Sequence, residues 1–373
     1  MEADWARSLP GAKGEMNMRK KTSCGLSVIS RHRQPIYGVA ALWILLLHLR
    51  TQIPLRGLLA VPSLLQRFGA CGVEIFCLMS GFGVYRSLER DPRALPFYRK
   101  RFARVFLPAF LVMATYLTLR AVPPARAIPL VTFFPYWWGA ETVWYVPFIL
   151  TMYLIYPLLF RLQRSRPKLL TALFVLSAVC TVAGAVAGLL PQRLDRSLHR
   201  IPVFLLGCVL APWINEDRQV SRPVLLGVIA AGAAALVSLC FFRYIDYAYP
   251  YWMRTCLYTL LAAAVIVCTA LASEWLARRG GAGAAVYRFL AFFGMISLEC
   301  YLLFTRWKDL LELWLPADAA DRVLLIDLGS LLFTVLGGLL LTRLCALIRD
   351  TFAHLPVPSP KDPQQEHPQQ AQR

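Results

Sequence analysis

This sequence of 373 residues has little charge: Asp, Glu, Lys and Arg make up 16% of it, while 58% is hydrophobic. A soluble domain usually carries about 25% charged residues, so the shortage of charge argues against a soluble globular protein. Apolar runs of membrane-spanning length recur along nearly the whole chain and leave no stretch long enough for a separate soluble domain. The composition therefore predicts an integral membrane protein.

Metal-site and export signals are also missing from the sequence. The ten cysteines form no CxxC pair and no Cys/His spacing typical of a metal site, so we interpret them as small packing residues and predict no metal. The N-terminal segment is polar and basic and lacks the short apolar core of a cleaved signal peptide.

Acidic residues are scarce: 21 Asp and Glu stand against 40 Lys and Arg, which gives a formal net charge of +19. The basic residues lie in short clusters between apolar spans, where Lys and Arg set membrane orientation and meet anionic headgroups. They are accompanied by no motif that reads nucleic acid, so we predict the lipid bilayer and not nucleic acid as their partner.

The hydropathy pattern predicts an all-α, polytopic transmembrane bundle of about ten spans. A basic tail (1–33) precedes the membrane domain (34–348), and a Pro- and Gln-rich disordered tail (349–373) follows it. With the N-terminus inside, 27 of the 40 Lys and Arg residues fall on the inner side, which predicts that both termini are cytoplasmic. The predicted spans are 34–50, 68–87, 103–121, 142–160, 169–189, 200–214, 223–242, 255–275, 287–305 and 324–347.

His48 lies in an apolar stretch near the outer half of the first span. An ionisable group in hydrocarbon is costly, and histidine titrates near neutral pH, so His48 is a candidate general base. The alternative is a structural histidine that is hydrogen-bonded or hydrated near a helix end.

Glu74 lies in the second span at a depth similar to that of His48. Each is about twelve residues from its cytoplasmic helix end, or about 18 Å at 1.5 Å per residue. We predict that the Glu74 carboxylate orients the His48 imidazole as part of a general-base pair. A carboxylate that caps a helix end is the alternative, because structural ion pairs occupy such sites too.

Three further groups of residues are candidates for a binding role. Arg101 and Arg104 share a helix face where the third span leaves the cytoplasm, and guanidinium groups bind phosphates, although positive-inside anchoring explains such charges as well. Glu299, near the middle of the ninth span, is a second acid or the structural partner of an arginine. The segment with Glu141, Trp144 and Tyr145 is an outer aromatic belt or a surface that stacks on sugar rings.

The ordered set of motifs resembles the acyltransferase type 3 family of bacterial membrane O-acyltransferases, over roughly residues 33–348. The resemblance implies that His48 is catalytic, that Arg101 and Arg104 serve the donor acyl-CoA, and that the acceptor is a hydroxyl of an envelope glycan or a lipid-linked sugar. The motifs that carry it are His48, Gly69, Gly72–Phe76, Ser80–Phe82, Arg101, Arg104, Pro108, Trp144, Tyr145, Tyr153, Pro157, Phe204, Gly207, Ser297 and Tyr301.

The chain departs from the family pattern at two positions. The family commonly has an arginine eleven positions before the histidine, where this chain has Tyr37, and Arg31 and Arg33 nearby are out of register with it. We therefore place Tyr37 in the donor site. The family's late Ser…Tyr motif often ends in a histidine, where this chain has Phe304. We expect a stand-alone member without a fused extracytoplasmic domain.

We therefore predict a multi-pass plasma-membrane enzyme that moves an acyl group, in the first instance acetyl, from acyl-CoA to a hydroxyl. Trp144, Tyr145, Glu141 and Glu299 are the residues predicted to meet the acceptor. The principal alternative is a transporter or flippase that uses the same buried charges as a substrate or proton path, and the third is a scaffold in which those charges are structural.

Overall fold

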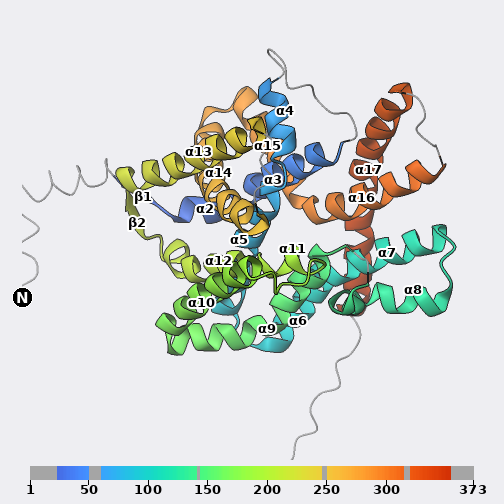
Figure 1. Cartoon of the computed structure of the whole chain (residues 1–373), viewed down its shortest axis with the longest axis horizontal. Helices are drawn as coiled ribbons and strands as arrows, with labels where there is room; N and C mark the ends of the chain where they lie inside the picture. The colour runs from blue at the N-terminus through green and yellow to red at the C-terminus, as the bar shows by residue number, and fades with distance from the viewer. Residues whose placement is uncertain (1–22, 50–59, 141–142, 246–249, 315–319, 354–373) are drawn as a thin grey trace, which may run out of the picture.

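The computed structural model describes residues 23–49, 60–140, 143–245, 250–314 and 320–353, which form a bundle of helices with one short two-stranded sheet (Figure 1). The first part contains β1 (Ser23–Gly25), α2 (Ser27–Arg31), α3 (Arg33–His48), α4 (Ala60–Arg67), α5 (Cys71–Arg90), α6 (Ala94–Arg101), the π-helix η3 (Phe102–Phe106), α7 (Leu107–Leu119), α8 (Pro124–Val131) and the 3-10 helix η4 (Phe134–Trp138). The second part contains α9 (Tyr145–Ser165), α10 (Pro167–Val186), α11 (Asp195–Leu198), α12 (Ile201–Asn215), β2 (Gln219–Ser221), α13 (Arg222–Tyr244), α14 (Tyr251–Arg279), α15 (Gly281–Met295), α16 (Ser297–Trp314) and α17 (Ala320–Ala353).

The prediction of an all-α membrane bundle agrees with this architecture, but the predicted number of spans is not reproduced. Within the described residues, seven helical segments are long and apolar enough to cross a membrane, and a bent pair makes eight. That pair is α15 and α16, which meet at 66°. One span was predicted over 287–305, and the structure breaks this segment at Ile296.

The β1 and β2 strands tie the start of the described chain to its middle. Ser23–Gly25 pair antiparallel with Gln219–Ser221. The backbone N–H of Ser27 donates to Asp217 Oδ1 at 2.8 Å and lowers the pKa of that carboxyl. The predicted tail (1–33) therefore overlaps the fold from Ser23 onward, and its first 22 residues lie outside the described part of the chain.

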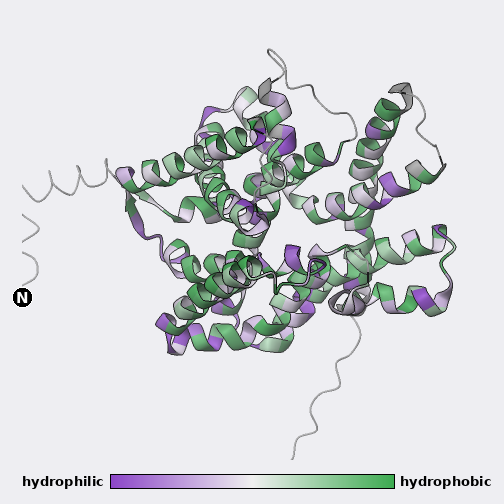
Figure 2. Cartoon of the chain, viewed as in Figure 1, coloured by the Kyte–Doolittle hydropathy of each residue, from purple (hydrophilic) through white to green (hydrophobic). Residues whose placement is uncertain are grey.

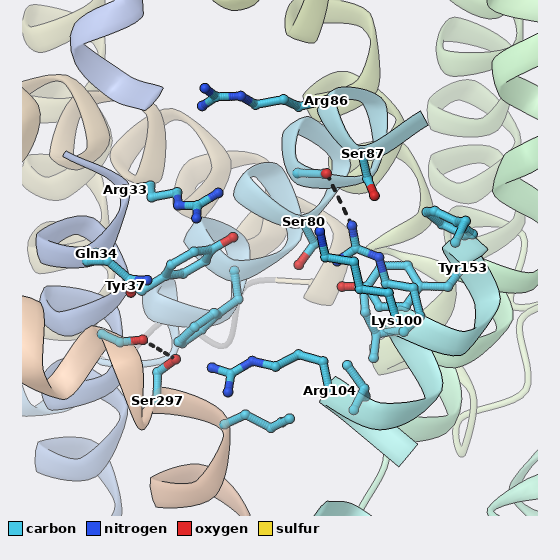
Figure 3. Close-up of a pocket in the computed structure, with 18 of the residues that line it drawn as sticks. Arg33, Gln34, Tyr37, Ser80, Arg86, Ser87, Lys100, Arg104, Tyr153 and Ser297 are labelled. Atoms are coloured by element: carbon cyan, nitrogen blue, oxygen red, sulfur yellow. Dashed lines mark hydrogen bonds between the residues drawn. The ribbon is translucent and has the colours of Figure 1, made fainter. Parts of the chain in front are cut away.

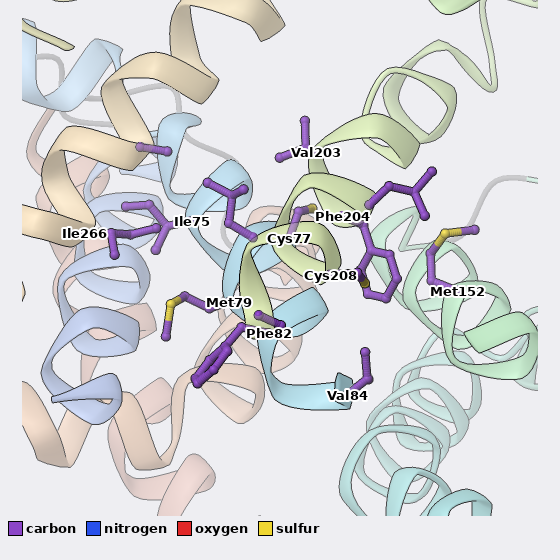
Figure 4. Packing of buried hydrophobic residues seen from close by; sticks show 14 of the residues in the cluster. Ile75, Cys77, Met79, Phe82, Val84, Met152, Val203, Phe204, Cys208 and Ile266 are labelled. Atoms are coloured by element: carbon purple, nitrogen blue, oxygen red, sulfur yellow. The ribbon is translucent and has the colours of Figure 1, made fainter. Parts of the chain in front are cut away.

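Helix α5 occupies the interior of the bundle, and 13 of its 20 residues are buried. Its apolar side chains, including Ile75, Met79 and Phe82, pack among residues of neighbouring helices such as Phe204 of α12 and Ile266 of α14 (Figure 4). A helix that is apolar on all sides is expected inside a bundle. The functional groups that α5 carries are therefore held in a close-packed environment.

Helix α10 has the opposite environment, since Leu170 is its only residue buried in the structure as described. Val175, Leu176 and Val179 are exposed, and hydrophobic residues cover the outward-facing helices as well as the interior (Figure 2). In water such an apolar surface would promote aggregation, whereas in a membrane it contacts the hydrocarbon chains of the lipids.

Helices α3 and α15 cross so closely that glycine is required where they meet. A Cβ atom at Gly38 would overlap the backbone carbonyl oxygen of Leu290. We expect Gly38→Ala to destabilise the protein by about 3 kcal/mol, because the carbonyl cannot move aside as a flexible side chain can. Thermal unfolding in detergent measures this, and Gly227→Ala, where a Cβ meets nothing within 4 Å, is the control. Equal midpoints of thermal unfolding for Gly38→Ala and Gly227→Ala would contradict the close approach of α3 and α15.

Candidate active site

A cavity of about 460 Å³ opens between α3, α5, α6, α9 and the break between α15 and α16 (Figure 3). Basic residues from four elements line it and give it a strongly positive character. Among the described lining residues Asp91 is the only acid, and its carboxylate already accepts from Arg93 at 2.9 Å. The basic lining residues are Arg33, Arg86, Arg90, Lys100, Arg101 and Arg104.

The structure brings the two predicted donor-site arginines to the same cavity. Arg101 donates to the carbonyl of Gly83 at 3.2 Å, and its guanidinium lies 5.2 Å from the ring centre of Phe97 and 5.1 Å from that of Tyr153. These contacts fix the side chain without neutralising its charge. The arginine therefore keeps its positive charge for a ligand.

Arg104 lies in the π-helix η3, and π-turns often occur at functional sites. Its guanidinium donates to Glu299 at 3.3 Å and to the carbonyl of Met295 at 2.8 Å. Met295 ends α15 and Glu299 lies in the first turn of α16. Arg104 therefore joins the two sides of the helix break to the cavity wall.

Tyr37 and Arg33 both line the cavity from α3. They are four residues apart and so lie on one helix face, one turn from each other. The Tyr37 ring stacks on Phe76 at 5.5 Å with 15° between the planes. Arg33 is out of register with the family's arginine position, yet it is a cavity residue, and its i,i+4 spacing from Tyr37 indicates this shared face.

Aromatic and apolar residues line the cavity as well as the arginines. They include Tyr145, Tyr153, Tyr301, Val73 and Ile44. The rings of Tyr145 and Tyr301 meet edge to face at 5.8 Å. Ile44 lies four residues before His48 on α3, so the lining of the cavity comes within about one helical turn, or 6 Å along the axis, of the histidine.

His48 is the last residue of α3 and is half-buried beyond the lining of the cavity. Its Nδ1 lies 2.8 Å from the carbonyl oxygen of Ile44. A carbonyl only accepts, so Nδ1 carries the proton of the neutral ring, and Nε2 keeps its lone pair. Within the described chain no group bonds to Nε2. This tautomer is the one that a general base needs.

Glu74 does not contact His48, which corrects the predicted pair. Its carboxylate lies 2.9 Å from the Arg200 guanidinium, and the two side chains are 0% and 5% exposed. Counting residues along the sequence placed Glu74 and His48 at a similar depth, but it could not show how α5 is rotated about its own axis. The missed partner, Arg200, precedes α12, and its guanidinium also lies 4.9 Å from the ring centre of Trp144.

Three of the four residues predicted to meet an acceptor lie in the described part of the chain, and each has a different environment. Trp144 covers Arg200, Tyr145 lines the cavity, and Glu299 is the partner of Arg104. Glu141 lies outside the described residues. In the part of the chain that the structure describes, His, Cys, Asp and Glu form no group of three or more that could hold a metal ion.

Comparison with known protein families identifies the family of the chain. A family model of the type 3 acyltransferases, described as an acyltransferase domain, matches residues 38–349. No curated protein and no solved structure matches the chain. The matched range includes His48, most of the cavity and the helices from α5 to α16.

Proposed function

Because this chain belongs to the type 3 acyltransferase family and is thus a membrane acyltransferase, we propose that it uses acyl-CoA to acylate a hydroxyl. The acyl group is proposed to be acetyl, and the acceptor an envelope glycan or a lipid-linked sugar. The reaction is then an O-acetylation at the cell envelope.

The charge and shape of the cavity carry this proposal. Coenzyme A is a polyphosphate at one end and a narrow arm with a thioester at the other. Six cations line the cavity, and guanidinium and ammonium groups suit phosphates. Ile44 lines the cavity too and lies four residues before His48 on α3, so a thioester bound beside Ile44 would lie near His48.

The proposed chemistry uses the lone pair on His48 Nε2. This nitrogen takes the proton of the acceptor hydroxyl, while the hydroxyl oxygen attacks the thioester carbonyl carbon. The carbon–sulfur bond then breaks, and the thiolate leaves and takes up a proton. The bond from Nδ1 to Ile44 holds the ring in the required tautomer throughout.

Release of free CoA from acetyl-CoA by the purified protein, measured with a thiol reagent, tests this function against the transport alternative. Release that depends on protein and acceptor supports the enzyme. A protein that binds CoA but releases no thiol with membrane acceptors present would instead favour a transporter or flippase.

The donor site gives a separate prediction. Arg101→Ala and Arg104→Ala should each weaken CoA binding by about 1.5–3 kcal/mol, the usual cost of a lost charged hydrogen bond. Arg99→Ala is the matched control, since Arg99 is exposed on the same segment but does not line the cavity. Titration calorimetry on protein in detergent measures all three. If Arg101→Ala and Arg104→Ala both bind CoA as tightly as Arg99→Ala, the two arginines do not bind the donor and serve only to set the membrane orientation.

We also propose that the mouth of the cavity and both termini face the cytoplasm of a plasma-membrane protein. Arg93 is 76% exposed beside that mouth. A cysteine placed at Arg93, with the exposed Cys180, Cys256 and Cys268 changed to serine, should resist an impermeant thiol reagent in intact cells and react after lysis. Labelling of this cysteine in intact cells would show that the mouth of the cavity faces the outside, which is opposite to the proposed orientation.

A further inference from the structure

A second cavity, of about 380 Å³, lies at the C-terminal end of α9. None of the described residues lines both this cavity and the candidate active site. Helix α9 is long and apolar enough to cross a membrane, so its end lies at the level of the lipid headgroups. The residues that line the second cavity are Pro92, Pro157, Phe160, Arg161, Arg164 and Ser165.

Two cations of the second cavity are not paired within the described chain. The side chains of Arg161 and Arg164 are exposed and make no hydrogen bond or ion pair with any residue that the structure describes. The Arg164 guanidinium lies 5.9 Å from the ring centre of Phe160, which is buried in the cavity wall. The described lining contains no acid. Because like charges three residues apart on a helix are neighbours and repel, an anion that binds both guanidinium groups is favourable.

An exposed apolar stripe continues from these arginines along α9. Leu154 and Leu158 are 66% and 69% exposed. Leu154, Leu158 and Arg161 are spaced four and three residues apart, so they lie on one face of the helix. The stripe runs from the end of the helix toward its middle, and therefore from the headgroup level into the hydrocarbon. This order of charge and apolar surface matches a molecule with an anionic head and hydrocarbon chains.

We propose that the second cavity binds an anionic phospholipid. Its phosphate accepts hydrogen bonds from the guanidinium groups of Arg161 and Arg164, and its acyl chains lie along Leu158 and Leu154. Basic pockets between membrane helices bind lipid headgroups in this way. A free phosphate would suit the two arginines equally well, but it has no chains to cover the leucine stripe. The stripe is therefore the reason to assign a lipid.

A lipid in this position borders the mouth of the candidate active site. Asp91 lines the active-site cavity and accepts from Arg93 at 2.9 Å, and Pro92, between the two, lines the second cavity. The loop between α5 and α6 thus contributes to both cavities. The bound lipid contacts this loop from the side of α9.

Native mass spectrometry of the full-length protein tests this binding. The protein is freed of lipid in a neutral detergent and titrated with dioleoyl phosphatidylglycerol, or with dioleoyl phosphatidylcholine, which has the same chains and no net charge. We expect phosphatidylglycerol to bind more tightly. In the double variant Arg161→Gln with Arg164→Gln, its affinity should fall roughly fivefold for each arginine removed, the usual effect of one basic residue on an anionic lipid. Equal affinity of the wild-type protein for the two lipids overturns the proposal.

The matched control is the double variant Arg166→Gln with Lys168→Gln. Both residues are exposed beside the end of α9 but do not line the second cavity, so this variant loses the same charge and should bind phosphatidylglycerol as the wild type does. Equal weakening in the two double variants would show a general attraction of basic residues to anionic lipid and would overturn the proposal.

Two further measurements separate lipid binding from other causes. The midpoint of thermal unfolding without added lipid should be the same in both double variants and in the wild type, because all four side chains are exposed. A loss of binding is then not a loss of fold. An excess of inorganic phosphate should leave phosphatidylglycerol bound to the wild-type protein, and its displacement would show that the site takes a free anion and not a lipid.

Discussion

Replacement of His48 by alanine is expected to lower the rate of acyl transfer by roughly 10²–10⁴-fold, the usual contribution of a general base. The reason is specific to the tautomer: Nδ1 is held by the Ile44 carbonyl, so Nε2 alone can take the acceptor proton. Transfer of label from acetyl-CoA to membrane acceptors measures the effect. Protein yield and CoA affinity should stay at wild-type values, because the ring does not line the donor cavity.

A His48→Gln variant is the matched control for this experiment. Glutamine retains polar atoms of similar reach but cannot accept the proton, so it should be as inactive as alanine. An alanine variant with more than a tenth of the wild-type rate would rule out the proposed base and return His48 to a structural role at the end of α3.

The second large effect is expected on stability. Glu74→Gln should destabilise the protein by about 3–5 kcal/mol, because it leaves the buried guanidinium of Arg200 without its counter-charge. The activity of membranes should fall with the amount of folded protein. Thermal unfolding of the detergent-solubilised protein, followed together with yield, measures this cost.

The double variant Glu74→Leu with Arg200→Leu separates structure from catalysis. Replacing a buried ion pair by apolar residues is often neutral for stability, so this protein should be folded and should bind CoA. If Glu74 serves only to pair Arg200, the double variant should retain much of the transfer activity of wild type. A folded double variant without activity would instead give Glu74 a direct part in the reaction.

The sequence predicted the class of fold, and it predicted that Arg101 and Arg104 lie together, for reasons that are local. Apolar runs identify helices whatever their neighbours are, and the three-residue spacing of Arg101 and Arg104 is enough to put both on one face. The break at Ile296 was not predicted, because the apolar run continues through it without a proline.

Pairings between helices were harder to predict. Depth follows from counting residues, and on that basis Glu74 was matched with His48. The partner of a buried carboxylate depends also on the rotation of its helix and on which other helix comes near. Arg200 directly precedes α12, more than a hundred residues later in the chain, and a single sequence does not show that the two residues come together.

The π-helix η3 has a consequence for how this segment tolerates change in length. A π-turn accommodates one residue more than an α-turn, and each residue corresponds to about 100° of rotation around the axis. Removing one residue from Phe102–Phe106 would let α6 and α7 join as a continuous α-helix. The α-turn would complete the same rotation with one residue fewer, so Arg101 would keep its direction, whereas Arg104, which lies inside the segment, would be shifted from Glu299 and Met295. Deletion of an apolar residue would thus separate Arg104 from the helix break, whereas a point substitution at an exposed position of the same segment, such as Phe102→Leu, should be silent.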